Sequence, residues 1–140
     1  MDSQTDSSPS RTRAAPQKLY RAEAVRQMDQ RVIREQQIPG IALMKRAGRA
    51  AFDRLRAHWP EVGAVQVLCG GGNNGGDGYV IAGLAAQRKL PVVAYTAVAP
   101  EKLQGEALEA YNFARQEGVT LVSDLADLPP VDNHSVLVDA

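Results

Sequence analysis

Val65-Gln66-Val67-Leu68-Cys69 leads directly into Gly70-Gly71-Gly72-Asn73-Asn74-Gly75-Gly76-Asp77-Gly78, and an apolar stretch from Tyr79 to Leu90 follows. The first five residues are typical of a buried strand, and the apolar stretch is typical of a helix. A strand, a tight loop and a helix in this order present backbone N–H groups to an anion at the helix N-terminus. The sequence therefore predicts a binding loop between a strand and a helix.

The loop is unusually rich in glycine, since six of the nine residues from Gly70 to Gly78 are glycine. Glycine is needed mainly where φ is positive or where a ligand comes close to the backbone. The spacing Gly70-x-Gly72-x-x-Gly75 matches the dinucleotide-binding fingerprint, but the acidic residue expected about 20 residues later is not evident. A P-loop is excluded because no Gly-Lys-Ser/Thr follows the glycines.

Strand and helix patterns alternate along the chain, which predicts a parallel sheet. Strands are predicted at residues 64–69, 91–95, 119–122 and 135–138. Helices are predicted at residues 19–36, from Pro39 to Trp59, at 78–89, and from Pro100 to a C-terminal glycine at Gly118. Short apolar strands suit a sheet that is covered on both faces. The expected fold class is α/β, a Rossmann-like three-layer α/β/α sandwich with a mainly parallel sheet.

The chain divides into a polar tail and one domain. Residues 1–17 are rich in Ser, Thr, Asp, Arg and Pro, so we expect a disordered tail. Residues 18–140 are expected to form the domain, apparently truncated at its C-terminus. Its second helix should bury a stripe formed by Ile41, Met44, Gly48, Ala51, Phe52, Leu55 and Trp59. Close packing against another helix would explain the glycine within this stripe.

Charge and composition limit the possible partners. The 140 residues include 16 Lys or Arg and 16 Asp or Glu side chains, which gives no electrostatic signal for nucleic acid or an anionic membrane. No apolar run is long enough for a transmembrane helix, and the N-terminus lacks a signal-peptide core. Cys69 is the only cysteine, which excludes an internal disulfide and fits a reducing compartment. We therefore expect a cytoplasmic protein without a nucleic-acid or membrane partner.

Polar residues are expected at the carboxyl edge of the sheet. The glycine loop follows the first strand and Asp139 ends the fourth, so Asn74 and Asp139 emerge from the same edge if the strands are parallel. Amide and carboxylate oxygens can bind a hard cation. Alternatively, Asn73 and Asn74 simply fill turn positions with positive φ. Asp77 is either the N-cap of the next helix or a group that contacts substrate or transfers a proton.

The remaining reactive side chains have simpler interpretations. Cys69 is predicted to be a small buried strand residue, because a catalytic thiol needs a basic partner and no histidine is near it in the sequence. His58 and His134 are isolated and lack the spacing of metal ligands, so we expect both at the surface.

Three motifs carry a resemblance to a known family. They are the string from Gly72 to Gly78, the helical features Arg26-x-x-Asp29 and Leu43-Met44-x-x-Ala47-Gly48, and the terminal strand Val136-Leu137-Val138-Asp139-Ala140. Together they resemble the YjeF N-terminal domain family, the NAD(P)H-hydrate epimerases, over roughly residues 19–140.

The resemblance implies an isomerase that interconverts the R and S epimers of hydrated NADH and NADPH. It implies that Asn73, Asn74, Gly75, Gly76 and Asp77 bind this substrate, and that Asn74 and Asp139 are ligands of a potassium ion. It identifies no catalytic residue. The expected partner is an ADP- or ATP-dependent dehydratase, fused or separate. A second copy of the chain, forming a homodimer, is a further candidate partner.

The chain departs from the family pattern at Lys45, where the family usually has an acid, and at Gly71, where it often has proline. Family domains also continue well beyond the strand that ends in Asp-Ala. Two other functions therefore remain open: a non-catalytic module of this fold that binds another protein, and a general Rossmann dinucleotide-binding domain.

We predict that this 140-residue chain alone has little or no epimerase activity. The resemblance implies that the elements which hold the site rigid follow Ala140, and Asp139 would then lie on a mobile end. Hydrated NADPH enriched in one epimer would be incubated with the purified chain while the approach to epimer equilibrium is followed. Equilibration at an enzyme-like rate, abolished by Asn74→Ala, would contradict this prediction.

Overall fold

The computed structural model describes residues 27, 30–31 and 38–140. The predicted N-terminal tail and nearly all of the predicted first helix lie outside these residues. The elements in chain order are α2 (Gly40–His58), β1 (Ala64–Cys69), α3 (Asn73–Gln87), β2 (Val92–Thr96), the 3-10 turn η1 (Pro100–Lys102), α4 (Gly105–Gln116), β3 (Thr120–Val122), the 3-10 turn η2 (Leu125–Asp127) and β4 (Ser135–Asp139).

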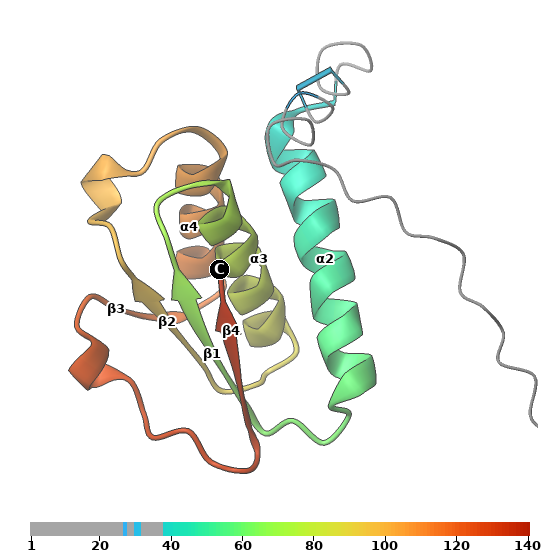
Figure 1. The fold of residues 1–140 in the computed structure, drawn as a ribbon, viewed down its shortest axis with the longest axis vertical. Coiled ribbons are helices and arrows are strands. Elements are labelled where there is room, and N and C mark those ends of the chain that lie inside the picture. The colour runs from blue at the N-terminus through green and yellow to red at the C-terminus, as the bar shows by residue number, and fades with distance from the viewer. Residues whose placement is uncertain (1–26, 28–29, 32–37) are drawn as a thin grey trace, which may run out of the picture.

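The four strands form one parallel sheet in the order β3-β2-β1-β4. In the centre, Val67 of β1 is opposite Ala94 of β2 on one side and Val138 of β4 on the other. All carboxyl ends therefore point to one edge of the sheet, the upper edge in Figure 1. The predicted α/β class, with its parallel sheet, is confirmed.

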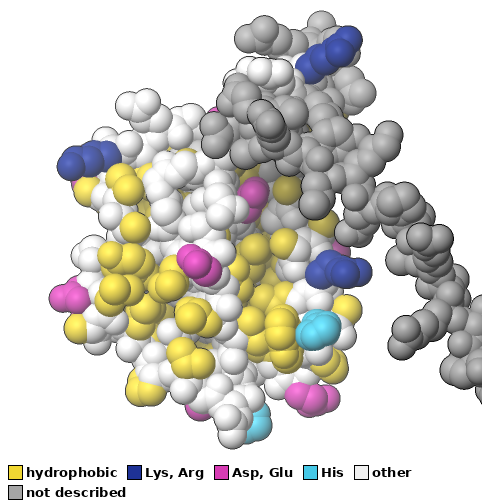
Figure 2. Space-filling view, in the orientation of Figure 1, with side chains coloured by type: hydrophobic (Ala, Val, Ile, Leu, Met, Phe, Trp, Pro, Cys, Tyr) yellow, Lys and Arg dark blue, Asp and Glu magenta, His cyan; other side chains and the backbone are white. Residues whose placement is uncertain are grey.

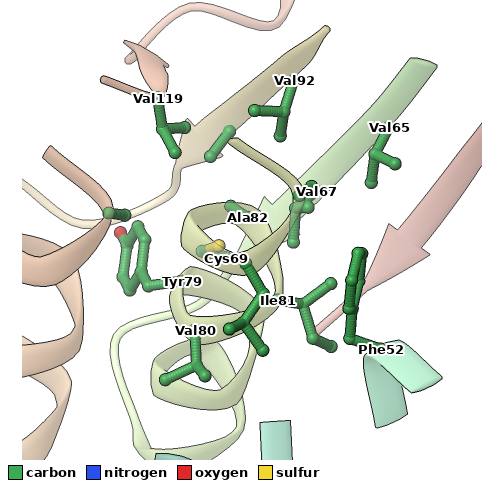
Figure 3. Packing of buried hydrophobic residues seen from close by; sticks show 14 of the residues in the cluster. Phe52, Val65, Val67, Cys69, Tyr79, Val80, Ile81, Ala82, Val92 and Val119 are labelled. Carbon is green, nitrogen blue, oxygen red and sulfur yellow. The ribbon is translucent and has the colours of Figure 1, made fainter. Parts of the chain in front are cut away.

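The described helices gather on one face of the sheet. Val65, Val67 and Cys69 point from β1 toward α3 and are almost completely buried, as Figure 3 shows. The helix α3 in turn packs against both α2 and α4. On the other face, the segment between β3 and β4 crosses the sheet, and the Gln66 side-chain amide donates a hydrogen bond of 2.7 Å to the Pro129 carbonyl.

The helix α2 confirms most of its predicted stripe, since Met44, Gly48, Phe52 and Leu55 are buried. The predictions for Ala51 and Trp59 are wrong, because Ala51 is exposed and the Trp59 side chain is 50% exposed. The helix ends at His58, and Trp59 already has non-helical backbone angles of φ −125° and ψ 74°. The 3.6-residue periodicity therefore does not extend to Trp59.

Two predicted helix starts are also wrong. The helix α3 begins at Asn73 and not at Gly78, so the asparagines form its first turn. The segment from Pro100 forms only a short 3-10 turn. The helix α4 starts at Gly105, where a φ of +55° interrupts the helical backbone conformation between the two elements. The predicted glycine after α4 is confirmed, because Gly118 has a φ of +85°.

Among the residues that the structure describes, no helix is long and apolar enough to cross a membrane.

We predict that Gly48→Ala destabilises the protein by about 1–3 kcal/mol through overpacking. A Cβ at this position would lie 2.5 Å from Cγ1 of Val80, a side chain that is itself only 1% exposed. This clash outweighs the gain of about 1 kcal/mol that alanine brings to a helix interior.

The matched control is Gly40→Ala in the same helix. Its new Cβ would meet the end of the flexible Glu106 side chain, which can turn away. We expect a much smaller change there, measured by urea unfolding followed by circular dichroism. A Gly48→Ala variant as stable as the wild type would show that α2 and α3 can separate without cost.

Candidate functional site

The end of β1 is held between its two neighbours at the carboxyl edge. The Gly70 N–H donates a 2.8 Å hydrogen bond to the Ala140 carbonyl, and the Ala140 N–H donates a 2.9 Å bond to Leu68. On the other side, the Ala97 N–H donates a 3.0 Å bond to the Cys69 carbonyl. The glycine segment therefore leaves the sheet at the predicted edge, from a fixed starting point.

The helix α3 begins with an uncapped N-terminus. Its N-cap is Gly72, with φ −102° and ψ −163°, and this residue offers no side chain to cap the first turn. The first helical bond runs from the Gly76 N–H to the Gly72 carbonyl, at 3.0 Å. The N–H groups before Gly76 have no acceptor within the helix, and the helix dipole adds positive potential there. Asn73 and Asn74 flank this end and are exposed to solvent.

Glycines bring this helix end close to the sheet. A Cβ on Gly75 would overlap the carbonyl oxygen of Gly70. A Cβ on Gly78 would lie 2.8 Å from Cβ of Ala140 and 3.0 Å from the Cys69 sulfur. By contrast, a Cβ on Gly72 would meet no atom within 4 Å. The first turn of α3 is thus packed on its inner side and open at its N-cap, where a ligand can approach.

Asp77 lies within α3 and does not cap it, because the helix begins four residues earlier, at Asn73. The N-cap alternative is therefore wrong. The side chain is half-buried and has a partner within the chain. Its proposed contact with substrate stays a prediction.

Asp139 shares the carboxyl edge with the start of α3. The register places it opposite Leu68, and alternation along the strand directs both side chains away from the face that α3 covers. Asn74 approaches the same edge from the helical side. Whether these two residues share one ion stays a prediction.

The described residues contain no cluster of three or more His, Cys, Asp or Glu side chains that could hold a metal ion. A potassium ion would depend instead on amide, carbonyl and carboxylate oxygens, which hard cations prefer. The exposed Asn74 amide and the exposed Asp139 carboxylate are groups of this kind. The donor chemistry at this edge therefore fits an alkali ion better than a transition metal.

Two buried titratable groups lie near the edge, and their surroundings disfavour the charged forms. Burial raises the pKa of the Cys69 thiol to about 12. Burial, followed by the charges of Cys69 and Tyr111, also raises the pKa of the Tyr79 hydroxyl. The prediction that Cys69 is a small buried strand residue is confirmed. His58 and His134 are exposed, as predicted, and lie at the amino edge of the sheet.

Sequence reasoning gave no role at the site to Met44 or Ala140. The Met44 sulfur would lie 2.6 Å from a Cβ on Gly76, so α2 reaches the first turn of α3. Ala140 occupies the space that Gly78 leaves free. Both residues stand in motifs that the sequence singled out, but the contacts between those motifs appear only in the folded chain.

Comparison with known proteins identifies related chains. Residues 40–140 match the family described as YjeF-related protein N-terminus. A bifunctional NAD(P)H-hydrate repair enzyme Nnr from Coxiella burnetii is 44% identical over 122 residues, which cover 87% of this chain and 24% of the relative. An NAD(P)H-hydrate epimerase from Rhodopirellula baltica is 37% identical over 97 residues, which cover 69% of this chain and 39% of that protein.

The fold is also found in a solved structure. The crystal structure of a yeast protein superposes with a TM-score of 0.66 at 20% sequence identity, and the match covers 79% of this chain and 49% of that one. At this identity the comparison supports the fold alone. The chain thus spans about a quarter to two fifths of the two bacterial relatives described above.

We predict that Gly75→Ala destabilises the protein by about 2 kcal/mol or more, because the new Cβ meets a main-chain oxygen that the sheet holds in place. The matched variant Gly72→Ser adds a side chain into open space at the N-cap, where serine is favoured. It should be at least as stable as the wild type. Thermal unfolding followed by circular dichroism measures both. Equal stability of the two variants would argue against close packing of α3 on β1.

Proposed function

The chain belongs to the family of YjeF-related protein N-termini, and on that premise we propose that it is the N-terminal part of an NAD(P)H-hydrate epimerase. The proposed reaction interconverts the R and S epimers of hydrated NADH and NADPH. Support comes from relatives named NAD(P)H-hydrate epimerase and from one named bifunctional NAD(P)H-hydrate repair enzyme. Because the chain spans only part of each relative, the activity of the whole protein is carried over as a proposal.

The observation that supports the proposal most strongly is the exposed, uncapped N-terminus of α3 at the carboxyl edge. A dinucleotide carries a negatively charged pyrophosphate, and free N–H groups at a helix N-terminus bind such anions. The N-cap Gly72 leaves open space for the ligand. We propose that Asn73, Asn74, Gly75, Gly76 and Asp77 bind the substrate, through backbone N–H groups and the two side-chain amides.

A potassium ion is the proposed cofactor, with the Asn74 amide oxygen and the Asp139 carboxylate among its ligands. When bound, such an ion would supply positive charge next to the substrate. Asn74 would then contact both the ion and the dinucleotide, so the two should bind cooperatively. We assign no catalytic residue.

The proposed setting is the repair of damaged nicotinamide nucleotides in the cytoplasm. The Coxiella relative is named as a bifunctional repair enzyme, which suggests a fused or separate ADP- or ATP-dependent dehydratase as partner. A homodimer remains part of the proposal. No observation favours the alternative protein-binding module or the general dinucleotide-binding domain.

The test is calorimetric binding of hydrated NADPH to the purified chain. We predict that Asn74→Ala weakens binding about tenfold, equivalent to about 1.4 kcal/mol, through lost hydrogen bonds and ion contact. Replacing potassium chloride by choline chloride at the same ionic strength should weaken wild-type binding, but should have little further effect on Asn74→Ala.

Asn133→Ala is the matched control, since Asn133 is exposed at the opposite edge of the sheet. It should bind hydrated NADPH as the wild type does. Binding unaffected by Asn74→Ala would remove this residue from the site. A chain that binds ordinary NADPH as tightly as the hydrate would instead favour a general dinucleotide-binding domain.

A further inference from the structure

A cavity lies at the amino edge of the sheet, at the opposite end of β1 from the glycine segment. Its volume is about 260 Å³, and it lies between the connection from α2 to β1 and the start of β4. In Figure 2 the histidines lie in the lower half of the visible face, and one of them lies beside hydrophobic side chains. The proposed epimerase site does not include this cavity.

Hydrogen bonds hold the two walls of the cavity together. The Gly63 N–H donates a 2.7 Å bond to the His134 carbonyl, which joins the connection before β1 to the segment before β4. In the second wall, the Asp132 carboxylate accepts a 2.9 Å bond from the His134 N–H and a 2.7 Å bond from the Ser135 hydroxyl. The cavity is therefore formed by tethered segments and not by loose loop ends.

An aromatic side chain is exposed in this cavity. Trp59 is 50% exposed although the helical pattern predicted it to be buried. The His58 ring packs against it edge-on, with ring centroids 4.7 Å apart and an interplanar angle of 69°. Trp59 is the only tryptophan of the chain. A half-exposed indole next to a cavity is a ready surface for stacking a planar group or a cation.

Glu61 is the acidic side chain that lines the cavity, and the lining residues include His58 and His134 but no Lys or Arg. The Ser135 hydroxyl and then the His134 N–H lower the pKa of the neighbouring Asp132, which keeps this carboxylate charged at neutral pH. The helix α2 also ends here at His58, and its last carbonyl groups contribute negative potential, which Arg56 and His58 in the same turn partly offset. The Glu61 and Asp132 carboxylates and the helix end favour a positively charged ligand.

We propose that the amino-edge cavity binds a small planar organic cation of the amidinium or guanidinium class. The planar group stacks on the indole of Trp59, and its N–H donors pair with the Glu61 carboxylate. Val62 and Val136 supply apolar lining for the rest of a single ring. An aromatic face next to a carboxylate is the combination that recognises such cations.

Benzamidine and benzamide test the proposal as a matched pair, since they have nearly the same shape and differ in charge. Because the chain has one tryptophan, its fluorescence reports directly on the cavity. We expect benzamidine to change this fluorescence saturably and benzamide to bind at least about fivefold more weakly. No saturable change with benzamidine, or equal binding of the two, would overturn the proposal.

Glu61→Gln tests the carboxylate without changing its size. We expect it to weaken benzamidine binding about fivefold, while circular dichroism shows an unchanged fold. The control is Glu101→Gln, an exposed glutamate in η1 near the carboxyl end of β2, which should leave binding unchanged. If both variants weaken benzamidine binding equally, general charge attraction explains the binding and the proposal is overturned. Binding that Glu61→Gln does not weaken would also overturn the proposal.

Discussion

The first turn of α3 lies directly against the end of β1, and the arrangement of the candidate site depends on that contact. Gly75 faces the Gly70 carbonyl and Gly78 faces Ala140, both at distances that leave no space for a side chain. Close approach brings the positive end of the helix to the edge where three neighbouring strands end. A side chain at either position would push α3 away from the sheet, and the N–H groups and Asn74 in its first turn would move away from Asp139.

The rest of the domain holds α3 in this position. The helix is buried on nearly all sides, because the sheet, α2 and α4 surround it, as Figure 3 shows in part. Such burial has a local cost. The Tyr79 hydroxyl is buried and has no hydrogen-bond partner among the described residues, although its ring packs edge-on against Tyr111. Apolar packing outweighs this lost hydrogen bond. The neighbouring elements therefore fix the position of α3.

Sequence reasoning located the strands well because short apolar runs that end at glycine or proline have few alternative structures. The predicted first strand coincides with β1, and the others shift by at most one residue at either end. Helix starts were less predictable. Glycine and asparagine have low helix propensity, so nothing local indicates that Asn73 begins α3. Tertiary packing against Met44 and Gly70 stabilises that turn, and no single-sequence pattern records such contacts.

The two edges of the sheet differ in electrostatic character because of helix direction. The helix α3 starts at the carboxyl edge, so free N–H groups face a ligand there, whereas α2 ends at the amino edge and directs carbonyl groups toward Trp59. The start of α3 therefore favours an anion and the end of α2 favours a cation. The helix α2 leads into β1 and α3 leads away from it, and both run opposite to the strand, which enforces this polarity. The same connectivity that creates the glycine-loop site thus places negative potential beside the exposed indole, without any cluster of acidic residues.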